Sequence, residues 1–265
     1  LYSDLLAGTR ADKKTGPLSN RTVRYVHAVL KMALKQATRW RLVPRNVAED
    51  ADAPRSVRPQ VEAWNDHEAR QFLATAHGDT YGAIWPVALH TGLRKGELLA
   101  LQWLDVDLER GALNVRRNVV ETKAGYVFGE PKTKAGRHTI TLPPACVALL
   151  RAHRAMRTNP LPIDPAQRDT ALIFQSTTGT LIDQRNLTTR FNDLVKRAGV
   201  KRITFHGMRH THATLLLLAG VNAKAVSARL GHASIGITLD TYAHVLPRME
   251  EHAAEAIEQA LARRA

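Results

Sequence analysis

This sequence of 265 residues contains one cysteine, Cys146, and no long hydrophobic run. A single cysteine cannot form an internal disulfide, so a scaffold held together by disulfide bonds is excluded. Cys146 follows Pro143-Pro144 in an apolar stretch, which predicts a buried thiol and fits a reducing, cytoplasmic setting. No apolar segment approaches the length of a membrane span, and no signal peptide is present, so no membrane partner is expected.

Acidic residues are also scarce: 24 Asp and Glu stand against 38 Lys and Arg, giving a net charge of +14 and a pI near 10.4. So large a net charge is informative about binding partners rather than about the fold. Nucleic acid is the commonest partner, because Lys and Arg displace its condensed counterions. A basic protein with no polyanion partner is the alternative. The hydrophobic content of 44% is enough for one or two domains.

The N-terminal part is predicted to be a small helical domain. A helical repeat of apolar residues runs over 18–39, with Ser19 as its N-cap. The opposite face is wholly basic and is either solvated or directed at phosphates. Residues 50–62 contain two prolines and no periodicity, which indicates a linker, and the domains are predicted to be 1–57 and 58–265. The sequence starts at Leu1 rather than Met, so we expect the first domain to be truncated at its N-terminus.

The second part is predicted to be helical around a small antiparallel sheet. Alternating residues indicate a strand near 113–119, followed by strands near 126–129 and 138–142. A turn at Ala135-Gly136 would join the last two strands and place Lys132 and Lys134 at or near a hairpin. The predicted helices span about 66–77, 80–91, Lys95 to before Asp105, 145–157, 184–198, 207–219, 223–230 and 248–263. The fold class is therefore mainly α with a small antiparallel β-sheet (α+β).

The first motif that suggests chemistry is Thr91-Gly92-Leu93-Arg94-Lys95-Gly96-Glu97-Leu98. Thr91-Gly92 ends one helix and the next starts near Lys95, so Arg94 lies at a helix N-terminus, where its guanidinium and free N–H groups can meet a phosphate. Glu97 is within reach to hold that guanidinium. By itself the pattern is weak, because an Arg at a helix start is usually a surface residue.

The second motif is Phe205-His206-Gly207-Met208-Arg209-His210-Thr211-His212. On a helix, His206 and Arg209 share one face and can address a single phosphate. The rival interpretation is a zinc site that uses His206, His210 and His212 with His232. Against zinc, His210 and His212 would diverge on a helix, and neither a His-Glu-x-x-His motif nor a Cys pair is present. We interpret His210 and His212 as packed or capping residues.

Two further patterns lie near the C-terminus. Residues 218–232 resemble a helix–turn–helix, with Lys224 and Arg229 on its second helix, which would fit a DNA-binding regulator without chemistry. Tyr242 lies in Asp-Thr-Tyr-Ala-His, ten residues after His232. A lone tyrosine is usually a core or surface residue. Beside two guanidiniums and two imidazoles, however, its hydroxyl is suited to covalent attack on a phosphodiester.

Taken together, these motifs resemble the tyrosine recombinase family, and in particular the phage-type integrases, over about residues 15–250. Besides the motifs above, the resemblance uses Pro-Lys-Thr-Lys-Ala-Gly-Arg before a strand, and Leu-Gly-His. Gly207-Met208 stands where Asp-Leu is more usual, at positions that are not catalytic. The family's catalytic order maps onto Arg94, Lys132, His206, Arg209, His232 and Tyr242. Lys134 lies close to Lys132 in the sequence. The alignment of the expected hairpin favours Lys132 as the general acid.

The resemblance implies a mechanism without metal or cofactor. Tyr242 would attack the scissile phosphate and form a 3′-phosphotyrosyl bond, while Lys132 protonates the leaving 5′-oxygen. Arg94 and Arg209 would stabilise the transition state. His206 would assist proton transfer at the tyrosine, and His232 would donate a hydrogen bond to the phosphate. The implied reaction is the integration and excision of a mobile element.

The family also implies partners and a setting. A helical core-binding (SAM-like) domain and the catalytic domain would clamp double-stranded attachment sites, as a monomer when free and a homo-tetramer in the synapse. A directionality factor and a host DNA-bending protein are further expected partners, in the bacterial cytoplasm on nucleoid or phage DNA. An apolar stripe on helix 248–263 fits docking on a neighbouring protomer and packing in cis equally well. The expected DNA contacts are Arg21, Arg24, Lys31, Lys35, Arg55, Arg58, Lys134, Lys224 and Arg229.

Three other functions remain open from the sequence. A type IB topoisomerase shares the chemistry and would relax supercoiled DNA without site preference. An inactive relative would bind DNA without cleaving it, although all six catalytic positions are present. A metal-dependent phosphoesterase would need carboxylate clusters that the sequence lacks.

Overall fold

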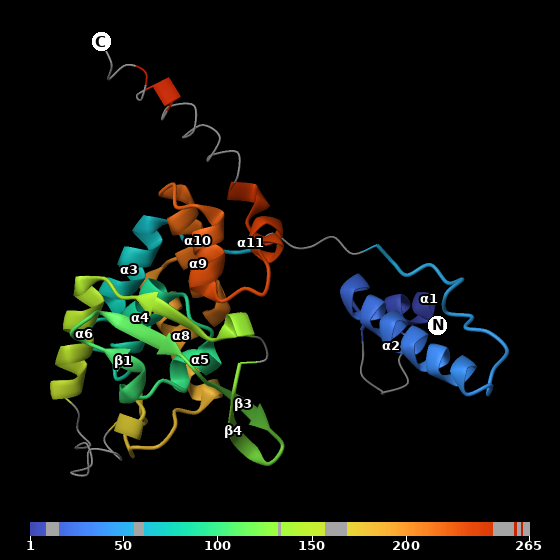
Figure 1. Cartoon of the computed structure of the whole chain (residues 1–265), viewed down its shortest axis with the longest axis horizontal. Coiled ribbons are helices and arrows are strands. Elements are labelled where there is room, and N and C mark those ends of the chain that lie inside the picture. The colour runs from blue at the N-terminus through green and yellow to red at the C-terminus, as the bar shows by residue number, and fades with distance from the viewer. Residues whose placement is uncertain are drawn as a thin grey trace. The chain divides into compact units, whose positions relative to one another are not determined.

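The computed structural model describes residues 1–8, 16–55, 61–131, 134–156 and 169–245, together with residues 257, 258 and 261. The chain divides into two compact units, residues 1–59 and 60–265 (Figure 1). Two residues separate this division from the predicted boundary after residue 57. Most of the expected helix 248–263 lies outside the described residues, as do Arg58, Lys132 and the side chain of Lys134. Within the described part, no helix is both long and apolar enough to cross a bilayer.

The first unit contains the helices α1 (Tyr2–Ala7) and α2 (Asn20–Arg39). The Ser19 hydroxyl accepts a hydrogen bond from the backbone N of Thr22 at 3.2 Å, so the predicted N-cap is confirmed. The Tyr2 hydroxyl lies 2.8 Å from Nδ1 of His27, which fastens α1 to α2. This contact leaves one side of α2 exposed to solvent, including Arg21.

The second unit is built mainly from helices. Their bounds are α3 (Asp66–Ala76), α4 (Ile84–Thr91), α5 (Lys95–Leu99), α6 (Pro144–Ala155), α8 (Gln184–Ala198), α9 (Phe205–Leu218), α10 (Ala223–Leu230) and α11 (Ile235–Thr241), with 3₁₀ turns η1 (Trp103–Asp105), η2 (Lys134–Gly136) and η3 (Ala243–Val245). Asn65 and Glu68 form a reciprocal capping box at the start of α3. Helix α11 was not predicted from the sequence, and it matters because it leads directly into Tyr242.

The strands form two sheets rather than the predicted single one. Strands β1 (Val106–Asp107), β2 (Ala112–Val115) and β5 (His138–Thr141) make one antiparallel sheet in the order β1-β2-β5, and β3 (Asn118–Thr122) and β4 (Gly125–Gly129) make a separate hairpin. The hairpin projects from the body of the unit (Figure 1). The α+β class is confirmed, because these small sheets accompany a helical unit.

The predicted hairpin between 126–129 and 138–142 is wrong. Strand β4 pairs with β3, and β5 pairs with β2. A two-residue turn joins Thr122 to Gly125, and closing so short a loop costs little entropy, so β4 pairs with the strand just before it. Residues 130–137 therefore connect two sheets, and this connection, rather than a hairpin turn, contains position 132.

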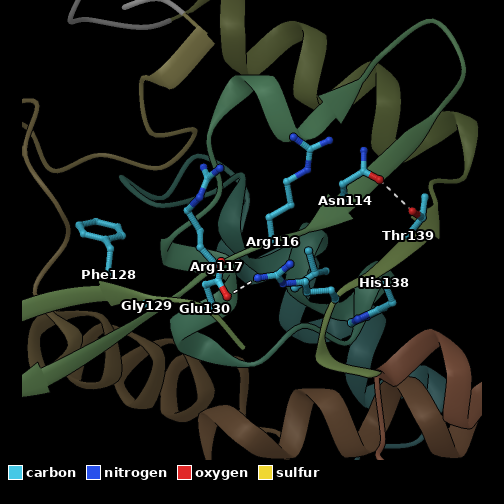
Figure 2. A pocket seen from close by; sticks show the side chains of 10 residues that line it. Asn114, Arg116, Arg117, Phe128, Gly129, Glu130, His138 and Thr139 are labelled. Carbon is cyan, nitrogen blue, oxygen red and sulfur yellow. Dashed lines mark hydrogen bonds and ion pairs between the residues drawn. The ribbon is translucent and has the colours of Figure 1, made fainter. Parts of the chain in front are cut away.

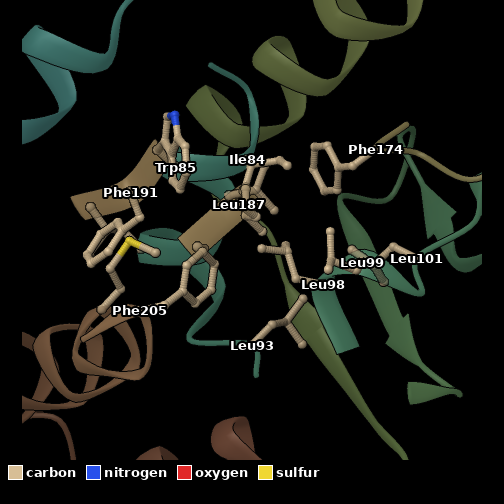
Figure 3. Close-up of a cluster of buried hydrophobic side chains, with 14 of the residues drawn as sticks. Ile84, Trp85, Leu93, Leu98, Leu99, Leu101, Phe174, Leu187, Phe191 and Phe205 are labelled. Carbon is tan, nitrogen blue, oxygen red and sulfur yellow. The ribbon is translucent and has the colours of Figure 1, made fainter. Parts of the chain in front are cut away.

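The core of the second unit includes most of α4, whose residues are largely apolar and buried (Figure 3). Trp85 on α4 lies 6.0 Å from the ring of Phe191 on α8 and 6.2 Å from that of Phe205 on α9. Cys146 is buried as predicted, and burial raises the pKa of its thiol to about 11. This core fixes α4, α8 and α9 to one another. Helix α4 ends and α9 begins beside the candidate site.

A second, smaller cluster of buried side chains lies against α9 and α10. Its members are Ala213, Leu217, Val226, Leu230, Tyr242 and Val245. Tyr242 follows α11 and is 1% exposed, so the ring of the predicted nucleophile is part of the packed interior. The chemistry of its hydroxyl therefore depends on the polar groups at the edge of this cluster.

Candidate active site

Arg94 immediately precedes α5 and is held by Glu97, as the sequence predicted. Its Nη1 donates to Oε1 of Glu97 at 2.7 Å, and its backbone N donates to Oε2 at 2.9 Å. The Glu97 side chain is 4% exposed, whereas that of Arg94 is 41% exposed. The buried carboxylate thus fixes the guanidinium in place and leaves part of it open to an anion.

Arg209, in the second turn of α9, joins two distant segments of the chain. It is 3% exposed; its Nη1 donates to the carbonyl O of Gly92 at 2.9 Å and its Nη2 to that of Leu230 at 2.6 Å. Gly92 lies two residues before Arg94, and Leu230 lies two residues before His232. Burial, aided by the charge of Arg94, lowers the pKa of Arg209 to about 10, so the guanidinium stays charged at neutral pH.

His232 follows α10 and is held by the next helix. Its Nδ1 lies 2.7 Å from Oγ1 of Thr238 on α11. Burial, with the positive charges of Arg209 and Arg94, lowers the pKa of His232 to about 4. The imidazole is therefore neutral at neutral pH. Burial and the same two arginines also lower the pKa of His206, so both predicted histidines share the electrostatic environment of both arginines.

Among the described residues, the side chain of His210 lies within hydrogen-bonding distance of the Tyr242 hydroxyl. Its Nδ1 lies 2.9 Å from Oη, and the two rings meet edge to face at 5.7 Å. Burial raises the pKa of Tyr242 to about 12, and the charge of Arg209 opposes this shift. Sequence reasoning interpreted His210 as a packed or capping residue and did not foresee this contact with the predicted nucleophile. The signal was its spacing of four residues from His206, which puts both rings on one helix face, 4.7 Å apart.

His212 and Arg229 form a buried polar connection behind the site. Nδ1 of His212 lies 2.7 Å from the carbonyl O of Leu89, and its Nε2 accepts from Nε of Arg229 at 3.1 Å. His212 is thus a packed residue, as predicted. Among the residues that the structure describes, no three His, Cys, Asp or Glu side chains are grouped as metal ligands.

Arg229, an expected DNA contact, makes several hydrogen bonds within the second unit. Besides its bond to His212, its guanidinium donates to the carbonyl O atoms of Thr141 at 3.1 Å and His90 at 2.9 Å. These bonds fasten α10 to β5 and α4, and a DNA contact by Arg229 stays a prediction. Sequence reasoning placed it on a recognition helix, but the exposed basic residue of α10 is Lys224.

The other expected DNA contacts lie mainly in the first unit. Arg21, Arg24, Lys35 and Arg55 are exposed there and Lys31 is half-buried. Arg24 also donates to the carbonyl O of Pro54 at 3.4 Å, which fastens α2 to the segment before residue 56. As DNA contacts these residues stay predictions, and so does Lys132 as the general acid.

Sequence reasoning missed an arginine-lined pocket of about 660 Å³ between β2, β4 and β5 (Figure 2). Arg116 and Arg117 follow β2, and Arg137 precedes β5. Arg137 pairs with Glu130 across the connection between the sheets, and Arg117 donates to Oδ2 of Asp105 at 3.0 Å. The side chains of Arg116 and Arg137 are each 54% exposed, so this pocket adds an accessible basic surface.

Gly92 allows the close packing behind Arg94, and its replacement should be costly. It ends α4 with φ +67°, and an added Cβ would lie 2.6 Å from Cδ2 of His212 and 2.8 Å from Cδ2 of Leu230. Left-handed strain of about 1 kcal/mol and overpacking of about 1–3 kcal/mol should combine. We expect Gly92→Ala to lower the free energy of unfolding by roughly 2–4 kcal/mol, measured by denaturant titration.

The matched control for this prediction is Gly199→Ala. Gly199 ends α8 with φ +64°, but an added Cβ there would meet nothing within 4 Å. It should lose only the strain contribution of about 1 kcal/mol. Equal losses for the two variants would contradict the packing argument at Gly92.

Comparison with known proteins shows clear similarity to one family. The family model described as "Phage integrase family" matches residues 62–249. A tyrosine recombinase XerC-like protein of Caldanaerobacter subterraneus is 31% identical over 216 residues, covering 76% of this chain and 55% of that protein. The ICEBs1 integrase of Bacillus subtilis is 26% identical, covering 92% of this chain and 67% of that protein. The chain thus spans about half to two thirds of these relatives.

Solved structures show the same similarity. The Tn1549 transposon integrase in complex with a circular intermediate DNA is 26% identical with a TM-score of 0.74, over 91% of this chain and 80% of that one. The XerA recombinase is 27% identical with a TM-score of 0.59, over 78% and 71% of the two chains.

Proposed function

Because this chain belongs to the phage integrase family, whose model matches residues 62–249, we propose that it is a site-specific DNA recombinase that cuts and rejoins DNA through Tyr242. The proposed reaction needs neither metal nor cofactor. It conserves the energy of the phosphodiester in a 3′-phosphotyrosyl bond, so that rejoining is the reverse of cutting. Integration and excision of a mobile element would be its outcome.

The observation that supports this proposal most is the pair of bonds from Arg209 to the carbonyls of Gly92 and Leu230. They bring the segment with Arg94 beside the segment that leads to His232 and Tyr242. Two guanidiniums, neutral imidazoles and a phenol then share one site. Such a site can bind the non-bridging oxygens of a phosphate through the arginines and offer a hydroxyl for in-line attack.

In the proposed step, Oη of Tyr242 attacks phosphorus and the bond from phosphorus to the 5′-oxygen breaks. Arg94 and Arg209 stabilise the added negative charge, because their positions are already fixed by Glu97 and by backbone carbonyls. His232 is neutral, and in the tautomer whose Nδ1 accepts from the Thr238 hydroxyl, its Nε2–H can donate to a phosphate oxygen. Lys132 is the proposed general acid for the 5′-oxygen.

Double-stranded attachment sites are the proposed substrate, consistent with the DNA bound by the Tn1549 integrase. We assign core binding to the first unit and catalysis to the second, with the exposed basic residues of α2 and the arginine-lined pocket contacting backbone phosphates. Assembly is proposed as a homo-tetramer in the synapse, with a directionality factor and a host DNA-bending protein. The proposed setting is DNA in the bacterial cytoplasm.

The proposal is tested by trapping the covalent intermediate. The DNA flanking the gene supplies candidate attachment sites, which are built into nicked duplexes that lose the 5′-hydroxyl strand after cleavage. We expect an SDS-resistant protein–DNA adduct in the presence of EDTA, and mass spectrometry of the digested adduct should find the nucleotide on the peptide containing Tyr242.

The other outcomes identify the competing functions. Relaxation of any supercoiled plasmid without site preference would indicate a topoisomerase. Site-specific binding without an adduct would indicate a non-catalytic relative. Cleavage that EDTA abolishes would indicate a metal-dependent phosphoesterase.

A further inference from the structure

We infer that His210 is the general base of the reaction and takes the proton of Tyr242 during attack on the phosphate. The inference rests on the proposed function and reassigns a role that the family resemblance gave to His206. It concerns a catalytic residue, because Nδ1 of His210 touches the reacting atom at 2.9 Å.

The surroundings of Tyr242 explain why a base is needed there. Its ring is 1% exposed, and Ala213, Leu217, Val226 and Leu230 belong to the same apolar cluster. An apolar enclosure disfavours the phenolate, and the pKa of Tyr242 accordingly rises to about 12. Little phenolate exists at neutral pH, so the proton has to leave while the bond to phosphorus forms.

The position of His210 on α9 fits this task. Arg209 precedes it on the same helix, and His206 lies one turn earlier with its ring 4.7 Å away. Among the residues that the structure describes, the charged and titratable groups of the site include His206 and Arg209 from α9, Arg94 and Glu97 at the start of α5, His232 after α10 and Tyr242 after α11. The base and Arg209 are thus carried by one helix, α9, and Arg209 is bonded to the segment that carries Arg94.

The step balances as follows. As Oη of Tyr242 forms its bond to phosphorus, the proton on Oη moves to Nδ1 of His210, which becomes an imidazolium. The bond from phosphorus to the 5′-oxygen breaks, and that oxygen takes a proton from the general acid. In rejoining, the 5′-hydroxyl attacks phosphorus and gives its proton to the group that acted as the acid, the bond from phosphorus to Oη breaks, and His210 returns its proton to Oη.

The test compares His210→Gln with wild-type protein on the nicked attachment-site duplex. Gln can still form a side-chain hydrogen bond, but its neutral amide cannot take up the proton at neutral pH. We expect single-turnover cleavage to fall by about 10²- to 10³-fold with unchanged DNA affinity. The pH profile should also change: the wild-type rate should level off once the base is neutral, whereas the variant rate should keep rising with pH.

A substrate with sulfur at the bridging 5′ position separates the base from the acid. A thiolate leaves without protonation, so this substrate should restore cleavage by Lys132→Ala but not by His210→Gln. Restoration of His210→Gln would place His210 on the leaving-group side and overturn the inference. Wild-type rates for His210→Gln would overturn it too.

A second measurement needs no DNA, and it does not require any variant to be active. In ¹⁵N-histidine-labelled protein, long-range ¹H–¹⁵N spectra distinguish the two neutral tautomers, and the His210→Gln spectrum assigns the signal. We expect Nδ1 to be unprotonated and to shift in Tyr242→Phe, because it loses the phenol donor. A proton on Nδ1 would make His210 the donor to Oη and overturn the inference.

These arms separate failure of the inference from failure of the proposed function. If wild-type protein forms no adduct on any duplex, the recombinase function fails. If wild-type protein forms the adduct and His210→Gln forms it equally fast, only the role of His210 fails. If His210→Gln melts well below the wild-type temperature, His210→Asn and the tautomer measurement decide the question.

Discussion

Tyr242→Phe is expected to abolish covalent attachment to DNA, lowering cleavage by at least about 10⁴-fold, in the range found when a catalytic nucleophile is removed. The variant loses only the hydroxyl, so its ring still fills the cluster around Leu217 and Leu230. Removing the partner of His210 should cost roughly 1 kcal/mol of stability. Adduct formation is measured on denaturing gels, and DNA affinity by a mobility shift.

The control for this prediction is Tyr126→Phe. The Tyr126 hydroxyl donates to Oδ2 of Asp183 at 2.8 Å and accepts from the backbone N of Gln184, so this variant also loses a bonded phenol hydroxyl. It should cleave at nearly the wild-type rate, because it lies in the β3–β4 hairpin away from Arg209. An adduct formed by Tyr242→Phe would show that another residue is the nucleophile.

Replacing Arg209 is expected to damage both the fold and the chemistry. In Arg209→Lys, a single ammonium cannot reproduce the two bonds to Gly92 and Leu230, so one buried carbonyl loses its partner. We expect a loss of about 1–3 kcal/mol in the free energy of unfolding and a fall of about 10²- to 10³-fold in cleavage. Denaturant titration and single-turnover cleavage measure the two effects.

Arg94→Lys provides the comparison. Its ammonium can still face Glu97, and the side chain of Arg94 is largely accessible, so stability should change by less than about 1 kcal/mol. Cleavage should nevertheless fall, because the paired donors to phosphate are lost. If Arg209→Lys proves as stable as Arg94→Lys, the bonds to the two carbonyls do not hold the segments together.

Helices with strong local signals could be predicted from the sequence. Periodic apolar residues and side-chain caps place α3, α8 and α10 within about one residue of their predicted bounds. The Glu97 contact with Arg94 was equally accessible, because residues three apart at a helix start are neighbours. What these features share is that their determining contacts lie close together in the sequence.

Features that depend on distant contacts could not be predicted in this way. Strands 112–115 and 118–122 read as one alternating run, and only tertiary pairing assigns them to different sheets. Helix α11 contains two isoleucines and two threonines, whose helix propensity is modest, so packing rather than local preference makes it helical. The inward course of Arg229 and the meeting of His210 with Tyr242 likewise follow from how α9, α10 and α11 pack.

The bonds made by Arg209 determine when, during synthesis of the chain, the site can form. Gly92 leaves the ribosome early in the synthesis of the second unit, whereas Leu230 and Tyr242 leave near its end. Until those last segments emerge, Arg209 lacks one of its two carbonyl partners and the site lacks its hydroxyl. Domains generally fold as units during synthesis, so nascent or prematurely terminated chains should be unable to carry out the proposed DNA cleavage.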